Sequence, residues 1–122
     1  MNAEEFKQRT QQFALRVIRV CEALPHYGAA KGPGRQWLRG GTSVDDNYRA
    51  ACRARSRADS VAKMAMVEEE CDESLYWLEL PVKLGRLKQS AVAELTEEGS
   101  QILALVVASI RTARRGPQSA IG

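Results

Sequence analysis

The residues whose spacing most resembles a chemical site are two carboxylates one helical turn apart, Glu70 and Glu73, followed a turn later by Trp77. Paired carboxylates that face the inside of a helical bundle can bind two metal ions, but such sites also need Glu-x-x-His motifs on other helices. The chain contains no Glu-x-x-His, and its single histidine, His26, lies in a segment rich in glycine and proline. We therefore expect neither a metal nor any other cofactor.

A structural polar core is the interpretation that the same carboxylates favour. Buried polar groups need hydrogen-bond partners. One or both carboxylates are expected to bond a buried polar group such as Asn47 or Tyr48, or a base on a neighbouring helix. The candidate polar core consists of Asn47, Tyr48, Glu70, Glu73 and Trp77.

Nucleophilic catalysis and phosphate-loop chemistry find no support in the sequence. Cys21, Cys52 and Cys71 lack a candidate base, and no serine has a Gly-x-Ser-x-Gly context. The glycines of residues 28–34 are not followed by the Gly-Lys-Ser/Thr that ends a phosphate-binding loop. The sequence thus predicts a protein that is not an enzyme.

Basic residues are the remaining functional signal. Arg49, Arg53 and Arg57 are spaced by four, so they would line one face if a helix continued that far. Such a row could neutralise successive phosphates of RNA or DNA. The alternative is a solvated face, or ion-pair partners for the acids of residues 68–79. The candidate nucleic-acid-binding residues are Arg49, Arg53, Arg55, Arg57, Lys63, Arg16 and Arg19.

Charge is distributed unevenly along the chain. Residues 1–63 hold 12 Lys or Arg and 6 Asp or Glu, whereas residues 64–122 hold 6 and 9, and the net charge is +3. This polarity could steer a polyanion to one side of the fold. It could equally pair one helix with its neighbour, or one subunit with the next.

Four segments with the hydrophobic period of a helix must position these residues. They have no competing strand pattern or internal repeat. They predict an all-α protein, an antiparallel up-down-up-down four-helix bundle that forms a single domain over residues 1–115, with a flexible tail at 116–122. The predicted helices are residues 3–24, 33–55, 57–84 and 89–114.

Individual residues give further predictions for the second and the fourth of these helices. Gly40 and Gly41 interrupt the second one without breaking its apolar phase, which predicts a close crossing or a bend. A break with a new cap at Thr42 or Ser43 is the alternative. In the fourth helix, the arginines at 111, 114 and 115 complement the negative end of the helix dipole.

The third helix has a clear start and an ambiguous end. Ser56 and Asp59 form a Ser-x-x-acid capping pattern, so they are the candidate helix cap. Pro81 should end or kink the helix, and Gly85 suits a left-handed residue just beyond it.

The last helix is apolar around nearly its whole circumference between Ile102 and Ile110. A small bundle covers only one face of each helix, so self-association is the expected cover. The candidate oligomer interface is Leu103, Val106, Val107 and Ile110.

The sequence also predicts a location. The longest apolar run, residues 102–108, is much shorter than the roughly 20 residues of a membrane span. No secretion signal opens the chain, and an odd number of cysteines without Cys-x-x-Cys spacing favours reduced thiols. A cytoplasmic protein with no membrane contact and no evident small-molecule substrate is expected.

Several motifs give the chain a family resemblance. The motifs are Gln36-Trp37-Leu38-Arg39, Gly41-Thr42-Ser43-Val44, Asn47-Tyr48-Arg49-Ala50-Ala51, Arg53-Ala54-Arg55-Ser56 and the run from Glu70 to Leu80. With these motifs the chain resembles the bacterial four helix bundle protein family, which includes the ribosomal-RNA intervening-sequence proteins and has the accessory variability proteins of diversity-generating retroelements as relatives.

The resemblance implies a bundle that assembles as a homopentamer, and the accessory variability relatives bind nucleic acid and a reverse transcriptase. It carries no catalytic residues over to this chain. Together with the basic residues, it predicts a non-enzymatic homo-oligomer, a pentamer, that binds RNA or DNA through a basic face. The alternative is a structural or protein-interaction scaffold that binds no nucleic acid.

Overall fold

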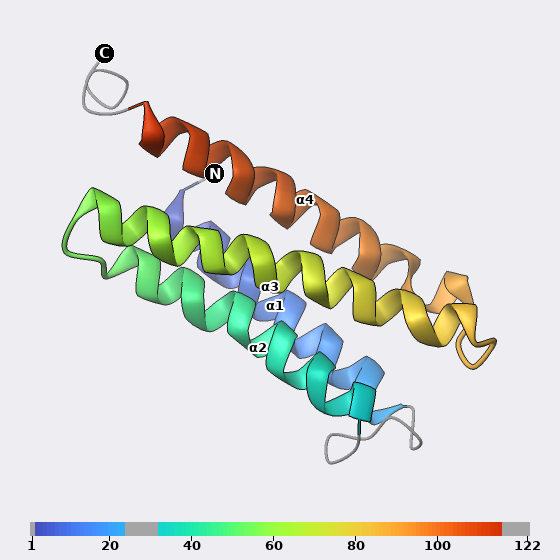
Figure 1. Ribbon diagram of the computed structural model, residues 1–122. Helices are drawn as coiled ribbons and strands as arrows, with labels where there is room; N and C mark the ends of the chain where they lie inside the picture. The colour runs from blue at the N-terminus through green and yellow to red at the C-terminus, as the bar shows by residue number, and fades with distance from the viewer. Residues whose placement is uncertain (1, 24–31, 116–122) are drawn as a thin grey trace.

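The computed structural model describes residues 2–23 and 32–115, and these ranges form four α-helices and no strand (Figure 1). The predicted all-α, four-helix fold is confirmed. The predicted tail at 116–122 and His26 lie outside the described residues. The helices are α1 (Ala3–Glu22), α2 (Gly32–Cys52), α3 (Arg57–Lys83) and α4 (Gln89–Arg114).

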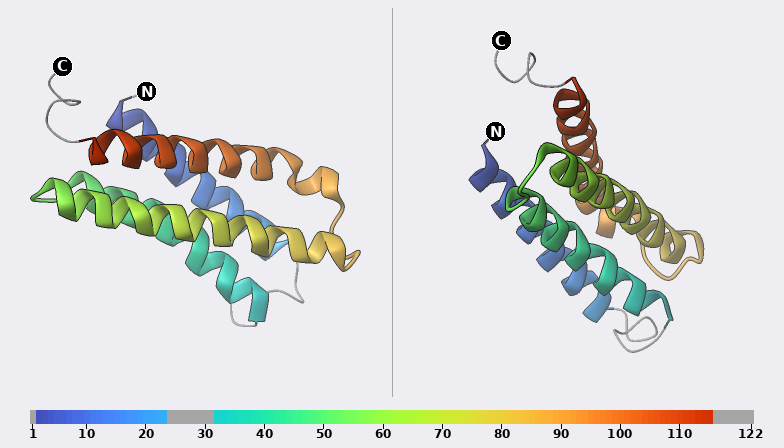
Figure 2. Two further views of the ribbon diagram at one scale, coloured as in Figure 1. Left: turned by 45° about the horizontal axis from the view of Figure 1, so that its top comes forward. Right: turned by 60° about the vertical axis from the view of Figure 1, so that its left-hand side comes forward.

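Each helix packs against two others. In the described ranges, α3 lies against α2 and α4, and α1 lies against α2 and α4 (Figures 1 and 2). The contact between α1 and α4 is the smallest of the four. No helix in these ranges combines the length and the apolar character that a membrane span requires.

The core follows the predicted stripes closely in α1 and α4. Both stripes are buried along their described length, because side chains three or four residues apart share one helix face. In α3 the 3–4 spacing predicts a buried stripe of Val61, Met64, Glu68, Cys71, Leu75, Leu78 and Val82. Met64, Cys71 and Leu78 are buried, but Val67 and Ser74 are buried in place of Glu68 and Leu75. The buried residues of the two confirmed stripes are Phe6, Thr10, Phe13, Val17 and Cys21 in α1, and Val92, Leu95, Gly99, Ile102, Val106 and Ile110 in α4.

Two glycines allow helices to approach closely. A Cβ on Gly41 would lie 3.0 Å from Val17 Cβ, and one on Gly99 would lie 2.7 Å from Leu75 Cδ2 and 3.1 Å from Phe13 Cε1. The α2 helix continues through Gly41 to Cys52. The predicted close crossing is therefore confirmed, and the alternative of a break at residues 42–43 is wrong.

The turn between α2 and α3 is longer than the sequence pattern indicates. The α2 helix ends at Cys52, three residues before its predicted end, and a turn precedes α3. Ser56 has extended backbone angles (φ −147°, ψ 161°), and its hydroxyl accepts a hydrogen bond of 3.0 Å from the backbone N–H of Asp59. Because a residue that caps the next helix must leave helical geometry, α2 has to end before it.

The α3 helix ends at Lys83, one residue before its predicted end, so the option that it ends at Pro81 is wrong. Gly85 then adopts the predicted left-handed conformation, with φ of 74°. Its N–H donates to Val82 O at 3.0 Å, and the Arg86 N–H donates to Pro81 O at 2.9 Å. These two bonds satisfy carbonyls of the last turn, and the proline ring is buried, so packing and capping offset the backbone bond that proline cannot make.

Candidate nucleic-acid interface

The α2–α3 turn and the C-terminal end of α4 lie at the same end of the bundle (Figures 1 and 2), and both segments are rich in basic residues. Cys52 from α2, Ser60 from α3 and Ala113 from α4 line one cleft, which places these segments side by side. We call the group the basic end; it consists of Arg53, Arg55, Arg57, Lys63, Arg111, Arg114 and Arg115.

The charges of the basic end are not neutralised by acids of the described residues. None of its seven side chains forms an ion pair within residues 2–23 and 32–115, and all except the partly buried Lys63 are exposed. Asp59 lies in the first turn of α3, and Glu4 and Glu5 lie in the first turn of α1. An excess of one charge on a small surface attracts ions of the opposite sign.

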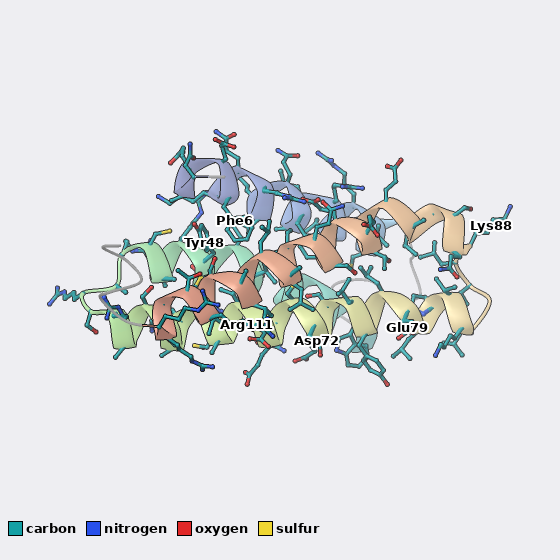
Figure 3. The ribbon with its side chains drawn as sticks, turned by 90° about the horizontal axis from the view of Figure 1, so that it is seen from above. Phe6, Tyr48, Asp72, Glu79, Lys88 and Arg111 are labelled. Carbon is teal, nitrogen blue, oxygen red and sulfur yellow. The ribbon has the colours of Figure 1, made fainter. Side chains whose placement is uncertain are left out.

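The α4 arginines belong to this surface, although the sequence pattern assigns them only to the helix dipole. Figure 3 places Arg111 at the same end of the molecule as Tyr48 and opposite to Lys88. The signal that could have found them is the bundle itself, since an antiparallel α4 must end beside the α2–α3 turn.

The predicted basic row Arg49, Arg53 and Arg57 does not form. The α2 helix ends at Cys52, so Arg53 lies in the turn and Arg57 begins α3. Arg49 is partly buried, and its Nε lies 3.2 Å from Asp45 Oδ1. The row depends on one continuous helix, which the Ser56 cap interrupts.

The α1 bases also lie away from the basic end. Arg16 and Arg19 belong to the second half of α1, which runs toward the opposite end of the bundle (Figure 1). Arg16 Nη2 lies 3.8 Å from Glu94 Oε2. Arg9 makes a two-pronged contact with Glu98, at 2.6 and 2.8 Å, and this hydrogen bonding raises the pKa of Arg9.

Glu70 and Glu73 meet a base on the neighbouring helix, one of the two arrangements that the sequence allows. Arg39 Nη1 lies 3.1 Å from Glu70 Oε1, and Arg39 Nη2 lies 2.9 Å from Glu73 Oε1. The hydrogen bond to Glu70 raises the pKa of Arg39. Trp77 Nε1 donates to Glu73 Oε1 at 3.4 Å, so three of the predicted core residues lie together.

Asn47 and Tyr48 do not join these carboxylates, which corrects the predicted polar core. The Asn47 side chain donates to Ser43 O on its own helix at 2.9 Å. The Tyr48 ring packs edge-on against Phe6, with centroids 4.6 Å apart, near the basic end (Figure 3). Their position along α2 sets them two or more turns from Arg39, beyond the reach of the acids.

Two of the four residues of the predicted oligomer interface are buried inside a single chain, and the other two are partly exposed. Val106 and Ile110 are 0% and 4% exposed in a single chain, so they belong to its own core and cannot contact a second subunit. Their helix stripe turns them toward α3. Leu103 and Val107 are partly exposed, and Leu105, which the prediction omits, is 36% exposed.

The described residues offer no assembled reactive group. They contain no group of three or more His, Cys, Asp or Glu side chains placed to hold a metal ion. Burial raises the pKa of the Cys71 thiol to about 12 and that of Cys21 as well, which disfavours the nucleophilic thiolate. Cys52 is exposed and lies at the basic end.

Fold and site together define a class: a helical bundle with an unneutralised basic end and no catalytic constellation in its described part. Residues 3–108 match the 23S rRNA-intervening sequence protein family. The chain belongs to this family, and the resemblance seen in the sequence motifs is confirmed.

A solved structure supports the fold. The chain is similar to a protein from Bacteroides thetaiotaomicron, described as a protein with unknown function from the S23 ribosomal protein family. The two are 28% identical, the similarity covers 92% of this chain and 100% of that chain, and the TM-score is 0.84. No curated protein matches the chain.

Proposed function

We propose that this protein is a non-catalytic, homo-oligomeric four-helix bundle that binds RNA or DNA through its basic end. The observation that carries the proposal is the group of seven bases that have no acid partner among the described residues. Lys and Arg side chains that neutralise phosphates release condensed counterions, which gives binding that depends on salt and not on sequence.

A scaffold that binds no nucleic acid is the alternative. It is favoured by the bases that pair with acids inside the chain, namely Arg9, Arg39 and Arg49. Under this alternative, Arg111 and Arg114 serve to stabilise the last turn of α4. The two proposals differ in what the unpaired bases of the α2–α3 turn do.

Charge reversal in this turn separates them. The double variant Arg53→Glu/Arg57→Glu should bind labelled RNA and duplex DNA more weakly than the unmodified protein at low salt. The plot of log affinity against log salt concentration should become less steep by about 2, since each phosphate contact contributes roughly 0.9. Fluorescence anisotropy at several salt concentrations measures both quantities.

A matched control makes the same charge change at the other end. Arg19 is an exposed base of α1, and Lys88 lies at the far end of the molecule from Arg111 (Figure 3). The Arg19→Glu/Lys88→Glu variant should keep the slope of the unmodified protein, with circular dichroism showing that both variants fold. Absence of binding at low salt, or an affinity indifferent to salt, would favour the scaffold.

Assembly is the second part of the proposal. Leu103, Leu105 and Val107 leave apolar surface exposed along α4, and the family resemblance implies five subunits. Light scattering coupled to gel filtration should give a mass of five times the 13.5 kDa of one chain. The mass of one chain at micromolar concentration would contradict self-association.

The up-down-up-down order of the helices is also part of the proposal. Two ion pairs join α1 and α4: Arg9 with Glu98, and Arg16 with Glu94. Residue numbers therefore rise along α1 while they fall along α4, which supports opposite directions for these two helices.

The absence of catalysis and a cytoplasmic location complete the proposal. The family name describes no reaction. None of the three cysteines forms a disulfide, which favours a reducing compartment.

A further inference from the structure

A cleft of about 210 Å³ opens between α2, α3 and α4 at the basic end. Val61, Met64 and Ile110 give it apolar walls, and two hydroxyls, those of Ser60 and Ser109, add polar groups. Apolar walls with a few polar groups are typical of sites for small organic groups.

The size of the cleft restricts what can enter it. The volume of about 210 Å³ is many times the roughly 10–15 Å³ that one water molecule needs in a cavity. The cleft is too large for a single ion and smaller than the roughly 300–1,000 Å³ of pockets for drug-sized ligands. A single flat ring system matches this volume.

The positive charge around the cleft favours an occupant whose ring carries negatively charged groups. Cys52 and Ala113 line the cleft, and the residues that follow them, Arg53 and Arg114, are exposed and have no ion pair in the described ranges. Arg57 lies one turn before Ser60 on α3. An occupant with a flat, largely apolar ring and negative charge on either side complements this arrangement.

A second, larger cleft shows the opposite character. It lies between α3 and α4, measures about 520 Å³ and is lined by Asp72 and Glu79 together with one base, Lys83 (Figure 3). Carboxylates there would repel a phosphate backbone. Volume alone would favour the larger cleft as a ligand site. The negative charge around it is what favours the smaller cleft as the site for a nucleic acid.

We propose that the cleft at the basic end receives one unstacked base of a single-stranded RNA or DNA, while the surrounding arginines hold the neighbouring phosphates. This inference rests on the proposed function and names its substrate class. A base in a duplex is stacked and paired, and extruding it costs free energy, so single strands should be preferred. Buried Tyr48 lies at the cleft but packs against Phe6, so the base would lie between aliphatic walls and not on an aromatic platform.

Filling the cleft tests the proposal. Ala113 lines the cleft and is partly buried, whereas Ala108 is exposed on the same helix and does not line it. The Ala113→Phe variant should bind a labelled single-stranded RNA about tenfold more weakly, a change of about 1.4 kcal/mol. Its affinity for duplex DNA should be unchanged, and the Ala108→Phe control should bind both as the unmodified protein does.

Two further measurements keep the test decisive. Ser109→Leu fills the cleft from an exposed position and should show the same selective loss if Ala113→Phe does not fold. A fluorescent base analogue within the single strand should change its emission on binding, and this change should disappear in the filled variants.

The outcomes separate this inference from the proposed function. If Arg53→Glu/Arg57→Glu abolishes binding while Ala113→Phe leaves single-strand affinity unchanged, the protein binds nucleic acid without a base site. If the unmodified protein binds neither probe, both proposals fail. Equal affinity for single strand and duplex, or equal competition by a polyglutamate peptide, would show that charge alone is read and would overturn the base site.

Discussion

Replacing Phe13 with alanine is expected to lower the free energy of unfolding by about 3–5 kcal/mol, the largest mutational effect that we predict. Phe13 is completely buried in α1, and its ring lies against the backbone of α4, where a Cβ on Gly99 would come within 3.1 Å of it. The contacts of Val17 with Gly41 and of Leu75 with Gly99 remain in this variant, and they limit how far the helices can close over the missing ring. Removing the ring therefore leaves a cavity.

Urea denaturation at one fixed protein concentration measures this effect, since the proposed self-association would make apparent stability depend on concentration. Leu15→Ala is the matched control, because Leu15 lies on the same helix and is 38% exposed. Its loss should stay near the roughly 0.5 kcal/mol typical of surface positions. Equal losses for the two variants would contradict the burial of Phe13.

The second large effect is a loss of stability in alkali that depends on Cys71. Burial raises the pKa of this thiol from 9.0 to about 12, so the folded chain retains a proton that the unfolded chain releases. Stability is therefore full below pH 9.0 and falls as the pH rises toward 12. Each pH unit of this range costs about 1.36 kcal/mol, so the free energy of unfolding falls by an amount on the order of 4 kcal/mol when the pH reaches the pKa of the folded chain.

Urea unfolding measured across this pH range tests the Cys71 contribution. Cys71→Ala should reduce stability at neutral pH, because it leaves a small cavity, but should flatten the alkaline decline. Cys52→Ala, which changes an exposed thiol, should keep the steep decline. Burial raises the pKa of the Tyr48 phenol in both variants, so Tyr48 adds to each decline, and Cys52→Ala removes only the hydrogen bond that raises this pKa further. Parallel pH profiles for the two variants would contradict the assignment.

Much of the fold follows from hydrophobic period alone. The α4 helix has the predicted bounds and the predicted buried stripe, because a long helix with an uninterrupted 3–4 rhythm buries one face wherever it packs. The close crossing at Gly41 was also predictable, since the apolar phase continues through it. In these places local preference and tertiary packing agree.

Predictions were wrong where a neighbouring feature overrides local preference. The α2 pattern continues to Arg55, but the cap at Ser56 needs a turn and ends the helix at Cys52. At Pro81 the opposite happens, because burial of the ring and two capping hydrogen bonds keep the helix intact. In both places the helix end depends on the neighbouring segment, so it cannot be predicted from the local sequence of one helix alone.

The candidate site was only partly predictable. Arg53, Arg55 and Arg57 were found from their charge and spacing, whereas Arg111 and Arg114 required knowledge of where α4 ends. Arg39 was missed as the partner of the carboxylates, although folding α2 and α3 back about their turn brings residues equally distant from it side by side. Spacing along one helix does not contain this cross-helix information.

The glycine crossings have a consequence for how such a chain can diverge. At Gly41 and Gly99 the separation between helices is set by main chain against side chain, so drift in the size of other core residues cannot change it there. These two contacts fix the separation between the helices in the middle of the bundle, and residues at both ends can vary without changing it. Substitutions at the α2–α3 corner are therefore expected to change the surface there without changing how closely the helices approach at Gly41 and Gly99.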